Sequence, residues 1–118
     1  MNETPVFSDE AVPLPEWTGD LEQDAIAGIR TVFDPEIPVN VYDLGLIYRL
    51  DVSNPEQIEI DMTLTAPGCP VAGELLKRVE RAVLLAPGAK AVKMNLVFDP
   101  PWSPANMSDE AKLELGML

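Results

Sequence analysis

The chain has 118 residues, a length that fits one domain with a single core. Twenty acidic residues against eight basic ones give a net charge of −12, which repels phosphate backbones, so we do not expect nucleic acid as a partner. No apolar stretch approaches the roughly 20 residues that a membrane span requires. No Lys or Arg precedes Arg30, so a signal peptide is not predicted and a cytoplasmic location is expected.

Residues 1–19 are predicted to form an acidic, proline-containing arm ahead of a domain that spans residues 20–118. The arm holds Pro5, Pro13 and Pro15 and shows no sustained hydrophobic period. Residues 1–29 contain seven acids and no base. A solvated tail is the favoured interpretation of this run, and a docking arm for a basic partner is the alternative.

The first half of the domain is predicted to be a helix followed by two strands. Apolar residues at helical spacing favour a helix from about residue 20 to 33, ended by Asp34-Pro35. Residues 46–52 and 58–65 alternate and are joined by the turn "SNPEQ", so an antiparallel hairpin is expected. Its apolar side should hold Leu46, Tyr48, Leu50, Val52, Ile58, Ile60, Met62 and Leu64, and its wet side Glu59, Asp61, Thr63 and Thr65.

The second half is predicted to be helix, strand, helix. A helical stripe runs from about residue 70 to 86, and residues 92–98 alternate as a third strand. "SDEAKLEL" favours a short helix capped by Ser108. Because each strand has one apolar face, we expect an α+β two-layer sandwich, with a three-stranded mixed sheet and helices on one face.

The single cysteine, Cys69, lies between Gly68 and Pro70. Proline is common at the first helical position, so Cys69 would be the helix cap, where the dipole and free N–H groups favour the thiolate. A thiolate attacks electrophiles and binds soft metals such as iron and zinc. A buried structural cysteine is the alternative, and the residues alone weigh the two equally. One cysteine excludes an internal disulfide.

Several classes of chemistry are disfavoured by what the sequence lacks. There is no histidine, so no cysteine–histidine nucleophile pair, and no second cysteine for a CxxC redox pair. An iron–sulfur cluster normally takes four cysteines, so a stable one would need a second subunit, carboxylates or outside thiols. No GxxxxGK loop is present, which disfavours an ATPase. We do not predict an enzyme.

Two further candidates are the acidic loop and a tryptophan. Asp34, Glu36 and Asp43 lie in the proline-stiffened segment "DPEIPVNVYD", where turn formation is favoured over metal binding. Trp102 in "FDPPWSP" has prolines near it on both sides. We expect it to cover the edge of the core, with a partner site as the alternative.

Three segments in this order resemble the small iron–sulfur cluster assembly domain family, which includes SufT and PaaD-like proteins. They are "DPEIPVNVYDLGLIY", "MTLTAPGCP" and "DPPWSPANMSDEAKLELGML". The resemblance covers residues 21–118 and is strongest to the SufT group. It implies a helix–strand–strand–helix–strand fold and an accessory role in maturing iron–sulfur proteins of the SUF type.

The resemblance also implies a site made of Asp34, Glu36, Thr65 and Cys69. Many relatives carry a second threonine where this chain has Ala66, so the polar lining is thinner here. In the leading hypothesis Cys69 binds iron or a cluster transiently, either by itself or opposite Cys69 of a second copy. Asp34 and Glu36 then supply oxygen contacts to the metal or tune the thiolate. Scaffold or carrier proteins and client apoproteins are then the expected partners. The alternative is a metal-free adaptor that binds clients or scaffolds.

Overall fold

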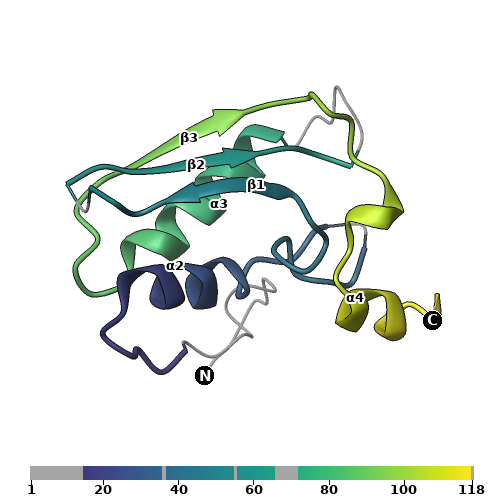
Figure 1. Cartoon of the computed structure of the whole chain (residues 1–118), viewed down its shortest axis with the longest axis horizontal. Coiled ribbons are helices and arrows are strands. Elements are labelled where there is room, and N and C mark those ends of the chain that lie inside the picture. Colours follow the sequence, from purple (N-terminus) through teal and green to yellow (C-terminus); the bar gives the residue numbers. More distant parts are fainter. Residues whose placement is uncertain (1–14, 36, 55, 66–71, 118) are drawn as a thin grey trace, which may run out of the picture.

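A three-stranded sheet with helices on one face organises the chain (Figure 1). The computed structural model describes residues 15–35, 37–54, 56–65 and 72–117. The elements are α2 (Leu21–Ile29), β1 (Ile47–Asp51), β2 (Ile58–Met62), α3 (Ala72–Leu84), β3 (Val92–Leu96), the 3-10 turn η1 (Pro104–Asn106) and α4 (Asp109–Glu114). The predicted order and the α+β sandwich are confirmed. In the described part of the chain, no helix has the length and apolar character to cross a bilayer.

The sheet has the order β1-β2-β3, with β2 in the centre. β1 pairs antiparallel to β2, as the predicted hairpin requires, whereas β3 is parallel to β2 because α3 carries the chain back between them. Alternation along β2 points its apolar side chains to the helices, and α2 and α3 cover them with their apolar stripes. The fully buried members of this core include Ile58, Ile60, Met62, Ala25, Ile29, Val79 and Val83.

The first helix ends four residues before its predicted end. Its last residue is Ile29 and Arg30 is the C-cap. The N–H groups of Thr31 and Val32 bond three residues back, which tightens the last turn and releases the chain. Phe33 then forms an isolated antiparallel bridge with Asn40. Val32 and Phe33, which extend the helical period in the sequence, therefore pair with the following loop instead of continuing the helix. Hydrophobic periodicity alone does not distinguish these two roles.

The predicted alternation of β1 is also wrong at Tyr48. The pairing of β1 with β2 slips between Ile47 and Arg49, which face Met62 and Asp61, so Tyr48 is an extra residue in the strand. It does not join Leu46 on the apolar side. Its hydroxyl instead donates to the carbonyl oxygen of Pro100 at 2.8 Å. This bulge directs an aromatic side chain toward the C-terminal part of the chain.

The C-terminal part forms a segment that we call the strap (residues 97–117), which leaves β3 and runs beside the end of the sheet to α4 (Figure 1). Met107 and Ala111 are buried in the core. The predicted cap of α4 is confirmed, since the Ser108 hydroxyl accepts from the Ala111 N–H at 3.1 Å. Gly45 has a φ of +83° and lies against the backbone of Asn106, so the absence of a side chain allows this close approach.

Gly45→Ala should destabilise the protein more than Gly88→Ala does. Both glycines have positive φ, so both variants incur a left-handed penalty of about 1–2 kcal/mol. A Cβ at Gly88 meets open space, whereas one at Gly45 meets the Asn106 carbonyl and adds about 1–3 kcal/mol of overpacking. Urea denaturation measures both free energies of unfolding. Equal losses would show that the strap does not depend on this contact.

Candidate functional site

Two of the predicted site residues, Cys69 and Glu36, lie outside the described residues, so their roles stay predictions. The helix α3 is described from Ala72 onward, and the predicted cap position of Cys69 lies outside the same range. The other predicted residues are described. They are Asp34, Asp43, Thr65 and Trp102.

Asp34 lies in the connecting loop (residues 30–46) between α2 and β1 and stabilises its own turn. Its Oδ1 accepts from the Ile37 N–H at 3.0 Å, and its N–H donates to the Val39 carbonyl at 3.2 Å. Such a bond to the backbone a few residues ahead is the turn chemistry that aspartate favours. The side chain is half-buried, so the turn also holds this carboxylate in a defined direction.

Asp43 joins three parts of the structure. Its carboxylate accepts from Asn40 Nδ2 at 2.9 Å and lies 3.6 Å from a guanidinium nitrogen of Arg30 at the end of α2. Its carbonyl oxygen accepts from the Ser108 N–H of the strap at 2.8 Å. The Arg30 guanidinium also lies 5.0 Å from the centre of the Tyr42 ring, within cation–π range. These contacts give Asp43 a structural role in holding the loop.

Thr65 lies three residues beyond the end of β2 and is half-buried. Thr63, two residues earlier, was predicted on the solvent-exposed side but is 1% exposed. β2 ends at Met62, so the alternation of the pleat no longer sets the direction of Thr63. Its N–H donates to the Leu46 carbonyl at 2.8 Å, which joins the end of β2 to the end of the connecting loop. Within the described ranges, its hydroxyl has no hydrogen-bond partner.

Trp102 packs against the core and is half-buried, in the position expected of a core cover. Its indole N–H donates to the Leu44 carbonyl at 2.7 Å. Because Leu44 belongs to the same loop as Asp34 and Asp43, the strap and the loop form one unit. Among the residues that the structure describes, no group of three His, Cys, Asp or Glu side chains is placed to hold a metal ion.

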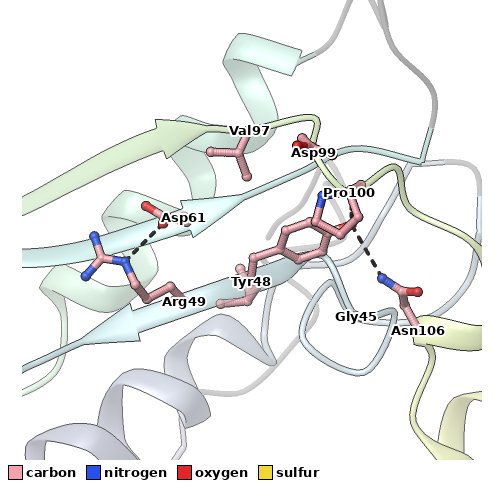
Figure 2. Close-up of a pocket in the computed structure, with 9 residues that line it drawn as sticks. Gly45, Tyr48, Arg49, Asp61, Val97, Asp99, Pro100 and Asn106 are labelled. Atoms are coloured by element: carbon pink, nitrogen blue, oxygen red, sulfur yellow. Dashed lines mark hydrogen bonds and ion pairs between the residues drawn. The ribbon is translucent and has the colours of Figure 1, made fainter.

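A pocket that sequence reasoning missed lies between the helix-free face of the sheet and the strap (Figure 2). Its volume is about 670 Å³. The sheet contributes one side and the strap the other, and the Tyr48 ring lies close to Pro100 in the middle. The lining residues are Gly45, Ile47, Tyr48, Arg49, Asp61, Val97, Asp99, Pro100 and Asn106.

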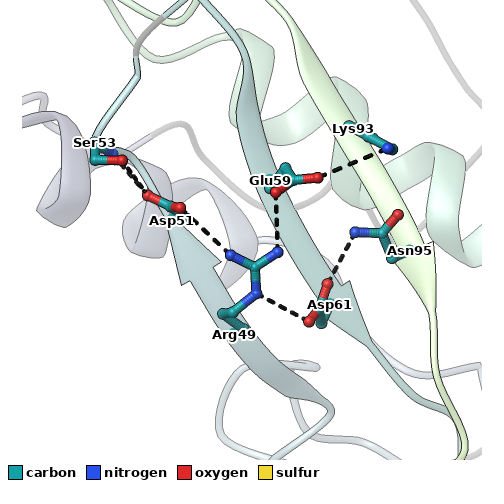
Figure 3. A network of polar contacts seen from close by, with 7 residues as sticks. All are labelled: Arg49, Asp51, Ser53, Glu59, Asp61, Lys93 and Asn95. Carbon is teal, nitrogen blue, oxygen red and sulfur yellow. Dashed lines mark hydrogen bonds and ion pairs between the residues drawn. The ribbon is translucent and has the colours of Figure 1, made fainter.

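A charged network on the helix-free face adjoins this pocket (Figure 3). All three guanidinium nitrogens of Arg49 contact carboxylates, with Nε 3.0 Å from Asp61, Nη2 3.0 Å from Glu59 and Nη1 3.4 Å from Asp51. The hydrogen bonds from Arg49 and then from Asn95 hold the pKa of Asp61 below its ordinary value. The same bonds to Asp61 and Glu59 raise the pKa of Arg49.

The sequence predicts only one side of this pocket, the polar face of the sheet. The alternating charges of β1 and β2 predict a polar outer face. The bulge at Tyr48 and the path of the strap are tertiary features, so no local pattern places Asp99 and Asn106 opposite Arg49.

The fold and the loop–strap unit define a small α+β domain with the element order helix–strand–strand–helix–strand–helix. A model of the iron–sulfur cluster assembly protein family matches residues 22–95. The chain belongs to this family.

Several known proteins are similar to the chain over most of its length. An Fe-S protein maturation auxiliary factor of Porphyromonas gingivalis is 52% identical over 97 residues, which are 82% of this chain and 92% of that protein. The auxiliary factor YitW of Bacillus subtilis is 35% identical, over 82% of this chain and 95% of its own. A solved domain of unknown function from Bacillus anthracis has a TM-score of 0.76 at 34% identity, over 83% of this chain and 93% of that one.

Arg49→Gln should raise the pKa of Asp61 toward its ordinary value of 3.8. Lys90→Gln removes the same charge from an exposed position outside the network and should leave that pKa unchanged. A group whose folded pKa is lowered stabilises the fold above its unfolded pKa, and this stability is lost as pH falls through the folded pKa. The stability advantage of the native chain over Arg49→Gln should therefore shrink on acidification below about pH 4.

Carbon-13 NMR titration of the Asp61 carboxyl, with urea denaturation at several pH values, measures both effects. An Asp61 titration that is identical in Arg49→Gln and in the native chain would contradict the network in Figure 3.

Proposed function

We propose that the protein is a non-enzymatic accessory factor in the assembly or transfer of iron–sulfur clusters, working in the cytoplasm. The observation that carries this proposal is the family match over residues 22–95. It is supported by two relatives that are named Fe-S protein maturation auxiliary factors. The alignment with this chain covers 92% and 95% of their own lengths. Scaffold or carrier proteins and client apoproteins are the partners that this role requires.

In this role Cys69 binds iron or a cluster transiently as cargo. It is the only thiol of the chain and precedes Ala72, the first residue of the 13-residue helix α3, by three positions. The start of a helix favours a negative charge, so this placement in the sequence favours the thiolate, the form that binds iron. One thiol holds a cluster weakly, which suits transfer rather than storage.

Asp34 and Glu36 supply carboxylate oxygens near the thiol in this proposal, and Thr65 lines the same region. The hydrogen bond from the Ile37 N–H orients the Asp34 carboxylate. The bond from Thr63 to Leu46 supports a short path between the loop that carries Asp34 and the segment that leads to Cys69. A second copy of the chain would add a second thiol.

A metal-free adaptor is the second candidate. It is favoured by the charge of residues 1–29, which contain seven acids and no base and would attract a basic partner. Anaerobic reconstitution with iron and sulfide separates the two candidates, because the adaptor predicts no bound iron. Gel filtration of the same samples shows whether any iron is held by a dimer.

Cys69→Ser should reduce maturation of a cluster-dependent enzyme about tenfold or more, because a soft ligand to the cargo is lost. The assay measures that enzyme's activity in cells or in a reconstituted transfer reaction. Ser103→Ala, a similarly small change at an exposed position of the strap, is the control and should mature the enzyme normally. Normal maturation by a folded Cys69→Ser variant would leave the adaptor as the remaining candidate.

Asp34→Asn separates the turn role of this residue from a metal role. Asparagine keeps an oxygen that accepts from Ile37, so the turn and the stability should be preserved. Loss of the charge should weaken anaerobic iron binding by about tenfold if the carboxylate contacts the metal. Asp109→Asn removes the same charge from the exposed start of α4 and should not change iron binding. Equal iron affinity in both variants would assign Asp34 to the turn alone.

A further inference from the structure

We propose that the pocket between the helix-free sheet face and the strap binds a short basic segment of a partner protein. The pocket is lined on one side by the sheet and the end of the connecting loop and on the other by the strap. Ile47, Tyr48, Arg49 and Asp61 come from β1 and β2, and Asp99 and Asn106 come from the strap. The strap lies beyond residues 22–95, the range that the family model matches, and contributes four of the nine lining residues.

The charge of this face favours a cation. The pocket and the network beside it carry the carboxylates of Asp51, Glu59, Asp61 and Asp99 and the cations Arg49 and Lys93, an excess of two negative charges. The whole chain has a net charge of −12, which attracts a basic partner at longer range.

The one guanidinium of the pocket is already occupied by acids. Each nitrogen of Arg49 contacts a different carboxylate, so its positive charge is already compensated, which disfavours a phosphate or carboxylate from outside. Asp99 differs, because its exposed carboxylate has no hydrogen-bond or ion-pair partner within the described ranges. The available charge at the rim is therefore negative.

The middle of the pocket suits the apolar part of a basic side chain. The Tyr48 ring lies beside Pro100, and Val97 lines the same pocket from the segment that follows β3 (Figure 2). An arginine or lysine places its methylene stem on such a surface and its charge near an aromatic face or an acid. The volume of about 670 Å³ exceeds what one side chain needs and leaves room for neighbouring backbone.

The pocket is held in shape by bonds across it. The Tyr48 hydroxyl donates to the Pro100 carbonyl at 2.8 Å, and Trp102 fastens the strap to Leu44 at 2.7 Å. Gly45 lets the strap approach the body closely at Asn106. A pocket that is pre-formed in this way loses less conformational entropy on binding.

The test is nitrogen-15 NMR of the full chain at roughly 0.15 M salt, a concentration that screens diffuse attraction. The probe is a blocked alanine pentapeptide with arginine at its second and fourth positions. Saturable shifts should concentrate on the amides of Tyr48, Arg49, Val97 and Asn106. The same peptide with glutamate in place of arginine should cause no shifts.

Asp99→Asn should weaken the arginine peptide about two- to fivefold, the range expected for one exposed charge pair. Glu56→Gln removes one charge from the turn between β1 and β2 and should leave the affinity unchanged. Tyr48→Leu removes the aromatic face and should weaken binding of the arginine peptide more than Asp99→Asn does. The nitrogen-15 spectrum of the variant shows whether it is folded.

Four results would overturn the proposal. They are an absence of saturable shifts, binding of the glutamate peptide to the same amides, equal weakening by Asp99→Asn and Glu56→Gln, and binding of spermidine as tight as that of the peptide. The last result would make the occupant a small polycation rather than a protein segment. The experiment uses no iron, so its failure is distinguishable from failure of the proposed maturation role.

Discussion

The attachment of the strap to the connecting loop is the interaction on which the rest of this structure depends. The Trp102 N–H donates to the Leu44 carbonyl, and the Ser108 N–H donates to the Asp43 carbonyl. Both acceptors are backbone groups of an irregular loop, which has no ladder of its own to satisfy them. By supplying these donors and burying Met107 and Ala111, the strap stabilises the described parts of this loop, residues 30–35 and 37–46.

The same attachment explains why the acids of the loop have two kinds of role. Asp43 accepts hydrogen bonds from Asn40 and from the strap and forms an ion pair with Arg30, so its role is structural. Asp34 accepts from the Ile37 N–H of its own turn, and this bond orients its carboxylate. Since a metal site needs ligands whose positions are set in advance, an acid held by its own turn is the better candidate of the two.

The polar face of the sheet balances charge where the chain as a whole does not. A net charge of −12 destabilises a compact state through self-repulsion. Arg49 offsets part of this repulsion by placing one guanidinium between three carboxylates on adjacent strands. Lys93 adds a longer contact to Glu59 at 3.8 Å. Three carboxylates against two cations leave one negative charge on the sheet, and Asp99 adds a second at the pocket.

Periodicity by itself determined the fold class, because alternation in β2 and the helical stripe of α3 each leave one apolar face that only a two-layer arrangement buries. Local chemistry also determined the Ser108 cap and the turn role of Asp34. Tertiary structure alone decided the early end of α2, the bulge at Tyr48, the burial of Thr63 and the pocket beneath the strap. Each of these depends on a partner far away in the chain, such as Asn40 for Phe33 or Pro100 for Tyr48, and a local pattern holds no information about such partners.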